Sequence, residues 1–322
     1  MRAAVYRQRG GSDVLQITDV PTPGPGVGEV RVRLQVAAVN PTDWKARAGG
    51  GPLDFDFQVP GQDGAGVIEA VGPGVDLERI GERVWVYHAA YERQHGTAAQ
   101  FTVVPARQAV RIPEGVSIDQ AAALGIPYIT AHGCLFADGA IDGQTILIHG
   151  GAGAVGHAAI QLARRAGAHV ITTVSSKAKA DIATAAGAHV VVNYTQKGAL
   201  ERIAAAARAG VDRILEVNLT HNLDLDLAVL VQHGVIVTYA ADAEDPAIPV
   251  RRLMGGNVDL RFVLVYRFTP AMITAAVDDI TAALAAGDLT PLPAIRFSLD
   301  EAAAAHDAVQ QRSTGKVLID LP

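Results

Sequence analysis

Glycines follow an apolar run in the middle of the chain, and their spacing indicates where phosphate groups could bind. Residues 145–149 read Thr-Ile-Leu-Ile-His, and glycines come at positions 150, 153 and 156. A buried strand that runs into glycines and then into a helix is typical of Rossmann units, which bind the pyrophosphate of a dinucleotide. Gly150 can make the tight turn, Gly153 lets backbone N–H groups approach the phosphates, and Gly156 lets the helix pack close to the sheet. The predicted contacts of this loop are Gly150, Gly153, Ala154, Val155 and Gly156.

The residues around the glycines support this interpretation. The spacing is G-x-x-G-x-x-G, whereas the commoner fingerprint is G-x-G-x-x-G, so the glycines alone are weak evidence. Apolar residues then recur near helical spacing, and Gly167 lies where such a helix would end. The alternative is a glycine-rich turn in another kind of α/β protein.

Hydroxyl and lysine side chains follow the second predicted strand, 168–174. The sequence there is Ser175-Ser176-Lys177-Ala178-Lys179, with no acidic residue. An acidic side chain at this point would bind the ribose 2′-hydroxyl of NAD, whereas hydroxyls and lysines suit the 2′-phosphate of NADP. The sequence therefore predicts NADP(H) as the cofactor. The alternative is that Lys177 and Lys179 are merely solvated residues at the start of a helix.

Composition limits the class of protein. The chain has 322 residues, of which 49% are hydrophobic, and its mean hydropathy is +0.21, which predicts a globular protein of two domains. A net charge of −6 argues against nucleic-acid binding. No apolar run approaches membrane-spanning length, and the first residues lack the layout of a signal peptide, so we expect a cytoplasmic protein without a membrane partner. Cys134 is the only cysteine, which excludes an intramolecular disulfide and a thiolate zinc cluster.

The pattern of strands and helices predicts an inserted domain. Residues up to about 110 are β-rich and broken by glycines, which indicates a small, strongly curved sheet or partial barrel. Strands and helices then alternate. The predicted strands are 145–149, 168–174, 189–193, 212–217, 234–240 and 260–266. A helix over 270–286 follows, and strands in the C-terminal tail should return to the first domain. The predicted domains are 1–122 with 268–322, and 123–267.

Several motifs together resemble a known family, the medium-chain dehydrogenase/reductases, and within it the zinc-free quinone oxidoreductase branch that includes zeta-crystallin. The resemblance covers essentially the whole chain. It implies a doubly wound parallel Rossmann sheet inserted into a β-rich, partly barrel-like (GroES-like) catalytic domain. Its motifs are Val39-Asn-Pro-Thr-Asp43, Pro60-Gly-Gln-Asp-Gly-Ala-Gly-Val-Ile-Glu-Ala-Val-Gly72, Gly81-Glu-Arg-Val84, Gly125-Ile-Pro-Tyr-Ile-Thr-Ala131, the glycine loop, Val192-Asn-Tyr194 and Thr314-Gly-Lys-Val-Leu-Ile319.

The resemblance also implies that no zinc is bound. Zinc-dependent relatives carry Cys, His and Cys as catalytic ligands, and those positions here correspond to Asn40, Gln62 and Ile126. These residues cannot form a Cys/His zinc site. We therefore predict an enzyme without a metal ion.

The same resemblance places residues around NADPH and the substrate. Ser175, Lys179 and Tyr194 border the 2′-phosphate, Arg312 reaches it from the C-terminal segment, and Thr130 lies behind the nicotinamide. Asn40 and Asp43 lie near the substrate. The predicted cofactor contacts beyond the glycine loop are thus Thr130, Ser175, Ser176, Lys179, Tyr194 and Arg312.

Two positions depart from the family pattern. Bacterial quinone reductases have tyrosines where this chain has Lys45 and Gly51, so the acceptor preference is open. The predicted catalytic residues are Asn40, Asp43, Lys45 and Tyr128, and the Thr130 hydroxyl is a further hydrogen-bond donor. Each has a structural alternative: Asn40 holds the turn at Pro41, Asp43 caps a helix that starts near Trp44, and Lys45 points to solvent.

These features predict hydride transfer from NADPH to a quinone or an α,β-unsaturated carbonyl, without a metal. The alternatives are an enoyl-thioester or haloacrylate type of double-bond reductase and, from another class, an NADPH-binding structural or RNA-associated protein. The apolar run Arg261–Arg267, at the predicted sheet edge, favours a homodimer joined through that edge.

Overall fold

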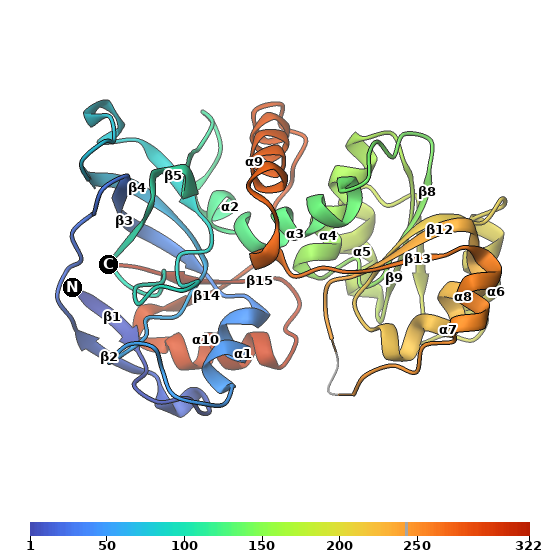
Figure 1. Ribbon diagram of the computed structural model, residues 1–322, viewed down its shortest axis with the longest axis horizontal. Helices are drawn as coiled ribbons and strands as arrows, with labels where there is room; N and C mark the ends of the chain where they lie inside the picture. Colours follow the sequence, from blue (N-terminus) through green and yellow to red (C-terminus); the bar gives the residue numbers. More distant parts are fainter. Residues whose placement is uncertain (242–243) are drawn as a thin grey trace. The chain divides into compact units, whose positions relative to one another are not determined.

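The structure is a computed structural model that describes residues 1–241 and 244–322. The chain forms two compact units (Figure 1). Unit 1 comprises Met1–Ile126 and Ile280–Pro322, and unit 2 comprises Pro127–Asp279. Unit 2 is thus a single insertion, but both of its limits, 127 and 279, lie later in the chain than the predicted 123 and 267. Each limit falls inside a helix, α3 (Gly125–Phe136) or α9 (Pro270–Ala285), and a helix gives no sequence signal where a domain ends.

Unit 2 is built on a six-stranded sheet whose strands all run parallel. The strands lie in the order β10-β9-β8-β11-β12-β13, which is that of a doubly wound dinucleotide fold. The predicted doubly wound sheet is therefore confirmed. The bounds are β8 (Thr145–Ile148), β9 (His169–Val174), β10 (Val190–Asn193), β11 (Val211–Glu216), β12 (Leu230–Thr238) and β13 (Asp259–Phe262).

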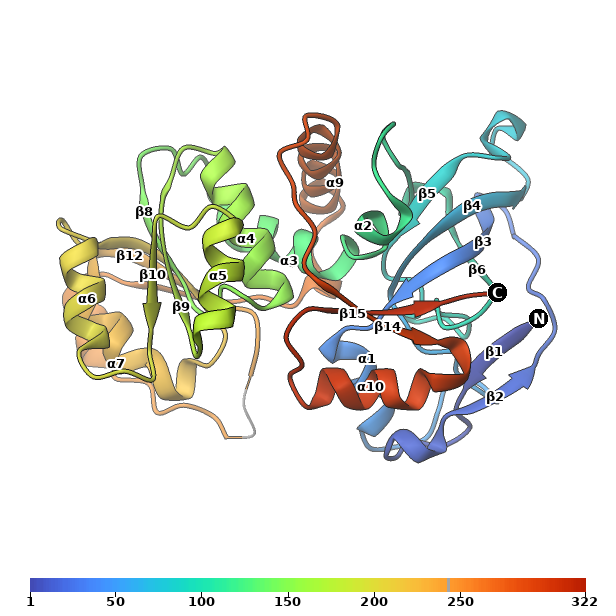
Figure 2. The ribbon, with the colours of Figure 1, turned by 180° about the vertical axis from the view of Figure 1, so that it is seen from behind.

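Helices cover both faces of this sheet, which explains why its central strands, such as β8, are largely apolar without alternation. Leu147, Ile171 and Ile214 contribute to the core under one face, while their neighbours Ile146, Val170 and Leu215 are also buried. Figures 1 and 2 show α4 and α5 on one face and α6 and α7 on the other. The helices are α4 (Ala154–Arg165), α5 (Lys177–Ala185), α6 (Ala199–Ala206), α7 (Leu219–Val229) and α8 (Val250–Gly256).

Strand β13 forms one edge of the sheet and is shorter than predicted. The sequence predicts a strand over 260–266, whereas β13 ends at Phe262 and Val265–Arg267 form a 3-10 turn. The physical reason is that β12 ends at Thr238, the residue paired with Phe262, so the ladder has no strand on which to continue. Phe262 and Leu264 are 68% and 57% exposed at this edge.

Unit 1 contains a seven-stranded mixed sheet in the order β14-β15-β3-β4-β5-β7, with β6 paired to β3. The C-terminal strand β15 pairs with β3, so the tail returns to the first domain as predicted. The register between β3 and β4 shifts twice, and such bulges bend a strand and increase its twist. The bounds are β3 (Glu29–Ala38), β4 (Asp63–Val71), β5 (Arg83–Val86), β6 (Phe101–Pro105), β7 (Ala109–Arg111), β14 (Ala294–Ser298) and β15 (Lys316–Asp320); β1 (Arg2–Val5) and β2 (Gln16–Asp19) form a separate pair.

Two helices from opposite ends of the sequence lie side by side in unit 1. Figures 1 and 2 show α1 (Pro41–Ala48) against α10 (Ala302–Gln310), and α2 (Ile118–Ala122) follows β7 along the chain.

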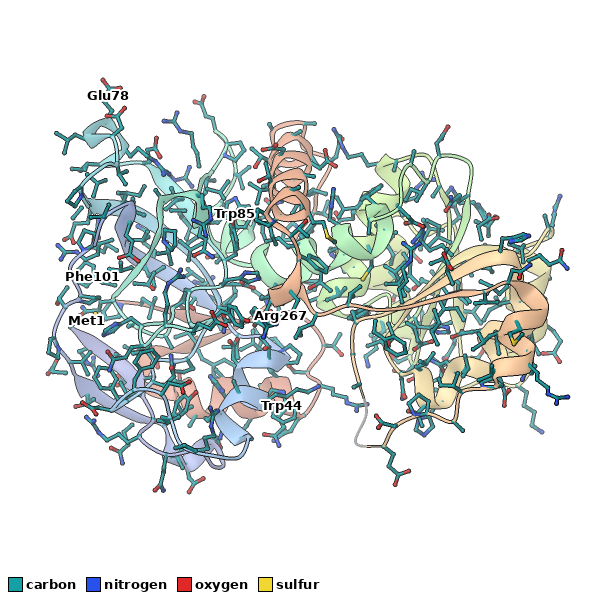
Figure 3. All side chains as sticks on the ribbon, in the orientation of Figure 1. Met1, Trp44, Glu78, Trp85, Phe101 and Arg267 are labelled. Carbon is teal, nitrogen blue, oxygen red and sulfur yellow. The ribbon has the colours of Figure 1, made fainter. Side chains whose placement is uncertain are left out.

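Trp85 in β5, labelled in Figure 3, is fully buried. The short 3-10 turns are Ser12–Val14, Leu77–Arg79, Ala106–Gln108 and Leu299–Glu301. Within the described ranges, no helix is long and apolar enough to cross a membrane.

Candidate cofactor site and buried charges

The glycine loop connects β8 to α4 at the carboxyl end of the sheet. Gly150 has a φ of 71°, a left-handed conformation that favours glycine. Gly153 is the N-cap of α4, and its N–H donates to the Gly150 carbonyl at 2.9 Å. The first N–H groups of α4, from Ala154 and Val155, therefore start at the loop, as an anion site at a helix N-terminus requires.

Two glycines of the loop leave no room for a side chain. A Cβ on Gly156 would lie 2.4 Å from the Gly150 carbonyl oxygen, and a Cβ on Gly151 would lie 2.1 Å from Thr172 Oγ1. The close packing expected of Gly156 is thus present. Gly151 has as little room for a Cβ atom. The spacing pattern did not reveal this, because the atom in the way belongs to Thr172 of β9.

Ser175, Ser176 and Lys179 lie together where β9 passes into α5. Ser176 is the N-cap of α5, and its Oγ accepts from the Lys179 N–H at 3.3 Å. The Lys179 ammonium donates to Ser175 Oγ at 3.1 Å, so the ammonium lies beside the strand end. Lys177 differs, because it is exposed and pairs with Asp181 at 3.0 Å. Only one of the two lysines is therefore positioned at the end of β9.

Tyr194 directly follows β10, the neighbour of β9. Its N–H donates to the Val174 carbonyl at 3.0 Å, and its side chain is 56% exposed. Carboxyl ends of adjacent parallel strands meet at one edge, so Tyr194 and the residues after β9 share that edge.

Tyr128 and Thr130 lie in the first turns of α3 and are buried. The Tyr128 hydroxyl accepts from Gln161 Nε2 at 2.9 Å. Burial raises the pKa of Tyr128, so the phenol stays protonated and can donate its own hydrogen.

Arg312 belongs to unit 1, where it follows α10. It is exposed and has a φ of 58°, and its N–H donates to the Val309 carbonyl at 3.0 Å. This left-handed residue ends the helix. Its predicted contact with the cofactor stays a prediction.

Asn40 and Asp43 form the start of α1. Asp43 Oδ2 accepts from the Asn40 N–H at 2.7 Å, and the Asp43 N–H donates to the Asn40 carbonyl at 3.0 Å. The helix begins at Pro41 and not near Trp44 as predicted, because proline is well suited to the first helical position and Asn40 supplies the N-cap. Asp43 thus caps the helix from its third residue.

Asn40 also joins a buried charge cluster that sequence reasoning missed, consisting of Asn40, Asp43, Asp63 and Lys316. The Asn40 amide donates from Nδ2 to Asp63 Oδ2 at 2.7 Å. Its Oδ1 accepts from Lys316 Nζ at 2.5 Å, and Lys316 also donates to the Val39 carbonyl at 3.3 Å. The sequence did contain one signal for this cluster. Lys316 is the first residue of the largely apolar strand Lys316–Asp320, and residues of such a strand are normally buried.

Asp63 fixes the start of α3. Both of its carboxylate oxygens accept from the Ile126 N–H, at 3.0 and 2.9 Å, and a Cβ on Gly125 would lie 2.1 Å from Asp63 Oδ1. Asn40 and Ile126, at two of the zinc-ligand positions of relatives, therefore donate to one carboxylate, and Gln62, at the third, directly precedes Asp63 in the chain. That donor set does not match a Cys/His zinc site.

Burial shifts the ionisation of this cluster. It raises the pKa of Asp43 to about 7, although the Asn40 N–H opposes the shift. Burial also raises the pKa of Asp63 to about 6, while Lys316 and the Ile126 N–H favour its charged form. Burial lowers the pKa of Lys316, which the two carboxylates counteract. Lys316 is therefore the cation whose charge acts on both buried carboxyl groups.

Lys45 has no part in this cluster. It is exposed on α1, and its Nζ lies 5.9 Å from the centre of the Trp44 ring, which Figure 3 labels. This position agrees with the structural alternative, a lysine that faces solvent. Its catalytic role remains a prediction.

One group of potential metal ligands is present in the described part of the chain. It consists of His149, Glu216 and Asp226, whose donor atoms lie within 4.8 Å of one another. The histidines showed no metal-like spacing in the sequence, because the two carboxylates come from β11 and α7, far along the chain.

Replacing Lys316 with methionine should destabilise unit 1 in a pH-dependent way. The loss should be about 3–5 kcal/mol near pH ~8, where both carboxyl groups are ionised without their cation. It should be smaller near pH ~5, because Asp43 and Asp63, with pKa values of about 7 and about 6, are then protonated. Urea unfolding at the two pH values measures the difference. The control Lys197→Met, at an exposed lysine, should change stability by less than about 0.5 kcal/mol at either pH; an equal loss for Lys316→Met at both pH values would contradict the argument.

Comparisons with known proteins agree with the architecture. A family model described as the alcohol dehydrogenase GroES-like domain matches residues 26–114, and one described as zinc-binding dehydrogenase matches residues 154–282. The quinone oxidoreductase of Rattus norvegicus is 31% identical over 321 residues, which cover 98% of this chain and 96% of the relative.

Solved structures also match the chain over its whole length. A mycobacterial protein in complex with NADPH has a TM-score of 0.85 and 29% identity, covering 99% of this chain and 100% of that protein. An NAD-dependent alcohol dehydrogenase has a TM-score of 0.90 and 29% identity, with complete coverage of both chains. The chain therefore belongs to the medium-chain dehydrogenase/reductase superfamily of oxidoreductases, and quinone oxidoreductases are among its relatives.

Proposed function

We propose that the protein is an NADPH-dependent reductase that transfers hydride to quinones or α,β-unsaturated carbonyls. The observation that carries this proposal is the Lys179–Ser175 contact at the end of β9, in a chain related to quinone oxidoreductases. A cation beside a hydroxyl suits the 2′-phosphate, and the acidic residue that would favour NAD is missing there. The similar solved structures include one with NADPH and one named as NAD-dependent, so the choice of cofactor is argued from the residues of this chain.

The loop residues fit a dinucleotide. Gly150 supplies the turn, and Gly156 brings the start of α4 against the loop, so backbone N–H groups can reach a diphosphate. Lys179, Ser175 and Tyr194 would hold the adenosine end from the ends of β9 and β10. When bound, NADPH supplies the hydride.

The chain itself would supply positioning and hydrogen bonds to the acceptor oxygen. Tyr128 is a protonated phenol with a hydrogen to donate, and Thr130 is a neighbouring hydroxyl. Asn40 has one amide hydrogen beyond the one that it gives to Asp63. Negative charge that develops on a quinone or enone oxygen needs such donors and a proton from solvent, and no metal ion. Lys45 remains a further candidate donor.

Turnover of a quinone panel with NADPH tests the activity. We expect reduction of quinones or enones, and we expect it to persist after treatment with a metal chelator, since Asn40, Gln62 and Ile126 cannot form the zinc site of relatives. Reduction of enoyl thioesters alone would favour a double-bond reductase. NADPH binding without any turnover would favour a binding protein, and loss of activity together with stoichiometric zinc would refute zinc independence.

Lys179→Ala should remove much of the preference for NADPH over NADH. Loss of one charged contact to phosphate should weaken NADPH binding by about 1.5–3 kcal/mol, with little effect on NADH. Fluorescence titration with both cofactors measures this. The matched control is Lys177→Ala on the same helix, whose ammonium pairs with Asp181, and it should leave both affinities nearly unchanged. Similar effects of the two substitutions, or equal affinities for the two cofactors in the parent, would argue against the proposed 2′-phosphate site.

A homodimer joined through β13 is the proposed assembly. Among the described residues β13 pairs on one side only, with β12, and Phe262 and Leu264 are exposed beside it, which favours pairing with a second copy. Phe262→Lys should shift the protein toward monomer in sedimentation velocity at micromolar concentration. Leu77→Lys, at an apolar residue of unit 1 that is 73% exposed, is the control and should not change the assembly. A parent protein that sediments as a monomer would rule out this dimer.

A further inference from the structure

A chain of three polar side chains joins helices α3 and α4 in unit 2: Tyr128, Gln161 and His157. Gln161 Nε2 lies 2.9 Å from the Tyr128 hydroxyl oxygen and 3.0 Å from His157 Nδ1. All three residues are buried. Tyr128 is a proposed donor to the acceptor oxygen, whereas the proposed hydride transfer gives no role to Gln161 or His157.

The amide nitrogen of Gln161 sets the direction of both hydrogen bonds. An amide NH2 group donates two hydrogens and accepts none. It therefore donates one hydrogen to the Tyr128 oxygen and the other to His157 Nδ1. The backbone carbonyl oxygen of His157 lies 3.4 Å from the same nitrogen, and a carbonyl oxygen only accepts. This neighbour favours the amide nitrogen, and not the amide oxygen, on that side of Gln161.

His157 is suited to accept a hydrogen from Gln161. Burial lowers the pKa of His157 to about 4, so the ring is neutral near neutral pH and one of its nitrogens has a lone pair. With Nδ1 as the acceptor, the ring hydrogen is on Nε2. His157 and Gln161 are four residues apart on α4, so their side chains share one face of the helix. The histidine therefore holds the amide in one orientation.

The orientation of the amide decides what the Tyr128 phenol can do. A phenol has one hydrogen to donate, and the amide nitrogen of Gln161 does not accept it. The phenol thus receives a hydrogen from Gln161 and directs its own hydrogen elsewhere. Hydrogen bonds in a chain also polarise one another, so a phenol that receives one donates more strongly to its next partner.

The chain of side chains starts beside the glycine loop. The His157 N–H donates to the Gly153 carbonyl at 2.8 Å, so His157 lies in the first turn of α4. Tyr128 lies in the first turn of α3. Side chains that are carried by helices are held more precisely than side chains on loops. The loop proposed to bind the diphosphate and the phenol proposed to bind the acceptor are therefore connected by hydrogen bonds.

We propose that Gln161, oriented by His157, is a positioning residue that directs the hydrogen of the Tyr128 hydroxyl toward the oxygen of the bound acceptor. This inference rests on the proposed reduction of quinones or α,β-unsaturated carbonyls. Negative charge develops on that oxygen as the hydride arrives, and a donor that already points there does not have to reorient. Gln161 acts through Tyr128 and does not itself touch the acceptor.

The alternative is a purely structural role, in which Gln161 only joins α3 to α4. The two roles differ in how the effect of Gln161 depends on Tyr128. If Gln161 only packs, its loss acts in the same way whether or not residue 128 has a hydroxyl group. If Gln161 acts through the phenol, its effect on kcat requires that hydroxyl group.

A double-mutant cycle on kcat tests the proposal, with NADPH and the acceptor of the quinone and enone panel that the parent reduces fastest. Tyr128→Phe should lower kcat on the order of a hundredfold, as loss of one such donor does. Gln161→Met keeps the length of the side chain and should lower kcat about fivefold, with KM for the acceptor and Kd for NADPH nearly unchanged. In the Tyr128→Phe protein, Gln161→Met should cause no further loss of kcat.

A second variant and a matched control keep the test decisive if Gln161→Met does not fold. His157→Leu removes the acceptor that orients the amide, and it should lower kcat in the parent but not in the Tyr128→Phe protein. The control, Gln108→Met, is the same substitution at a buried glutamine of unit 1, whose Oε1 accepts from Arg93 at 2.8 Å. It should leave kcat nearly unchanged.

The outcomes separate this inference from the proposed function. Equal losses of kcat with and without the Tyr128 hydroxyl group, from Gln161→Met or from His157→Leu, overturn the inference. A kcat equal to that of the parent in Gln161→Met or in Tyr128→Phe also overturns it. In each of these cases the parent still reduces its acceptor, so the proposed function stands. Absence of turnover in the parent overturns the proposed function, and this inference with it.

Discussion

The cofactor site depends on a steric constraint, the contact of the first turn of α4 with the backbone of the loop that precedes it. A diphosphate can be held by N–H groups only where backbone replaces side chains, and a Cβ on Gly156 would lie 2.4 Å from the Gly150 carbonyl oxygen. The same contact sets where α4 crosses the sheet. It thereby fixes the carboxyl end of β8, on which the proposed phosphate site and the buried histidine both depend.

Buried charge is the second theme of the molecule, and it occurs in each unit by itself. In unit 1, Lys316 and the Asn40 amide hold two carboxyl groups at the start of helices α1 and α3. In unit 2, His149 holds two more under the glycine loop. Buried ion pairs add little net stability, because desolvation offsets attraction. Their value lies in orientation, since each cluster fixes the beginning of a helix or of a binding loop.

These clusters connect ionisation with function. Carboxyl groups with raised pKa values change their charge near neutral pH, where surface carboxylates do not. The reductase proposed above would therefore respond to pH through groups that are buried away from solvent. Lys179 differs from these groups, since it is a partly exposed cation, and the role proposed for it is to distinguish one phosphate group.

The sequence by itself determined the doubly wound sheet, its insertion into a β-rich unit, the glycine loop and the residues after β9, because these are local patterns in which neighbours along the chain carry the signal. The sequence predicted an edge strand that extends too far toward the C-terminus. Strand β13 ends where its partner β12 ends, and the length of the partner is decided by the pairing of the strands and not by the residues of β13. Only the tertiary structure brought Lys316 to Asn40, and Glu216 and Asp226 to His149. Residues so far apart along the chain leave no periodic trace in one sequence, because their contact is decided by how the strands are ordered and how the helices pack on them.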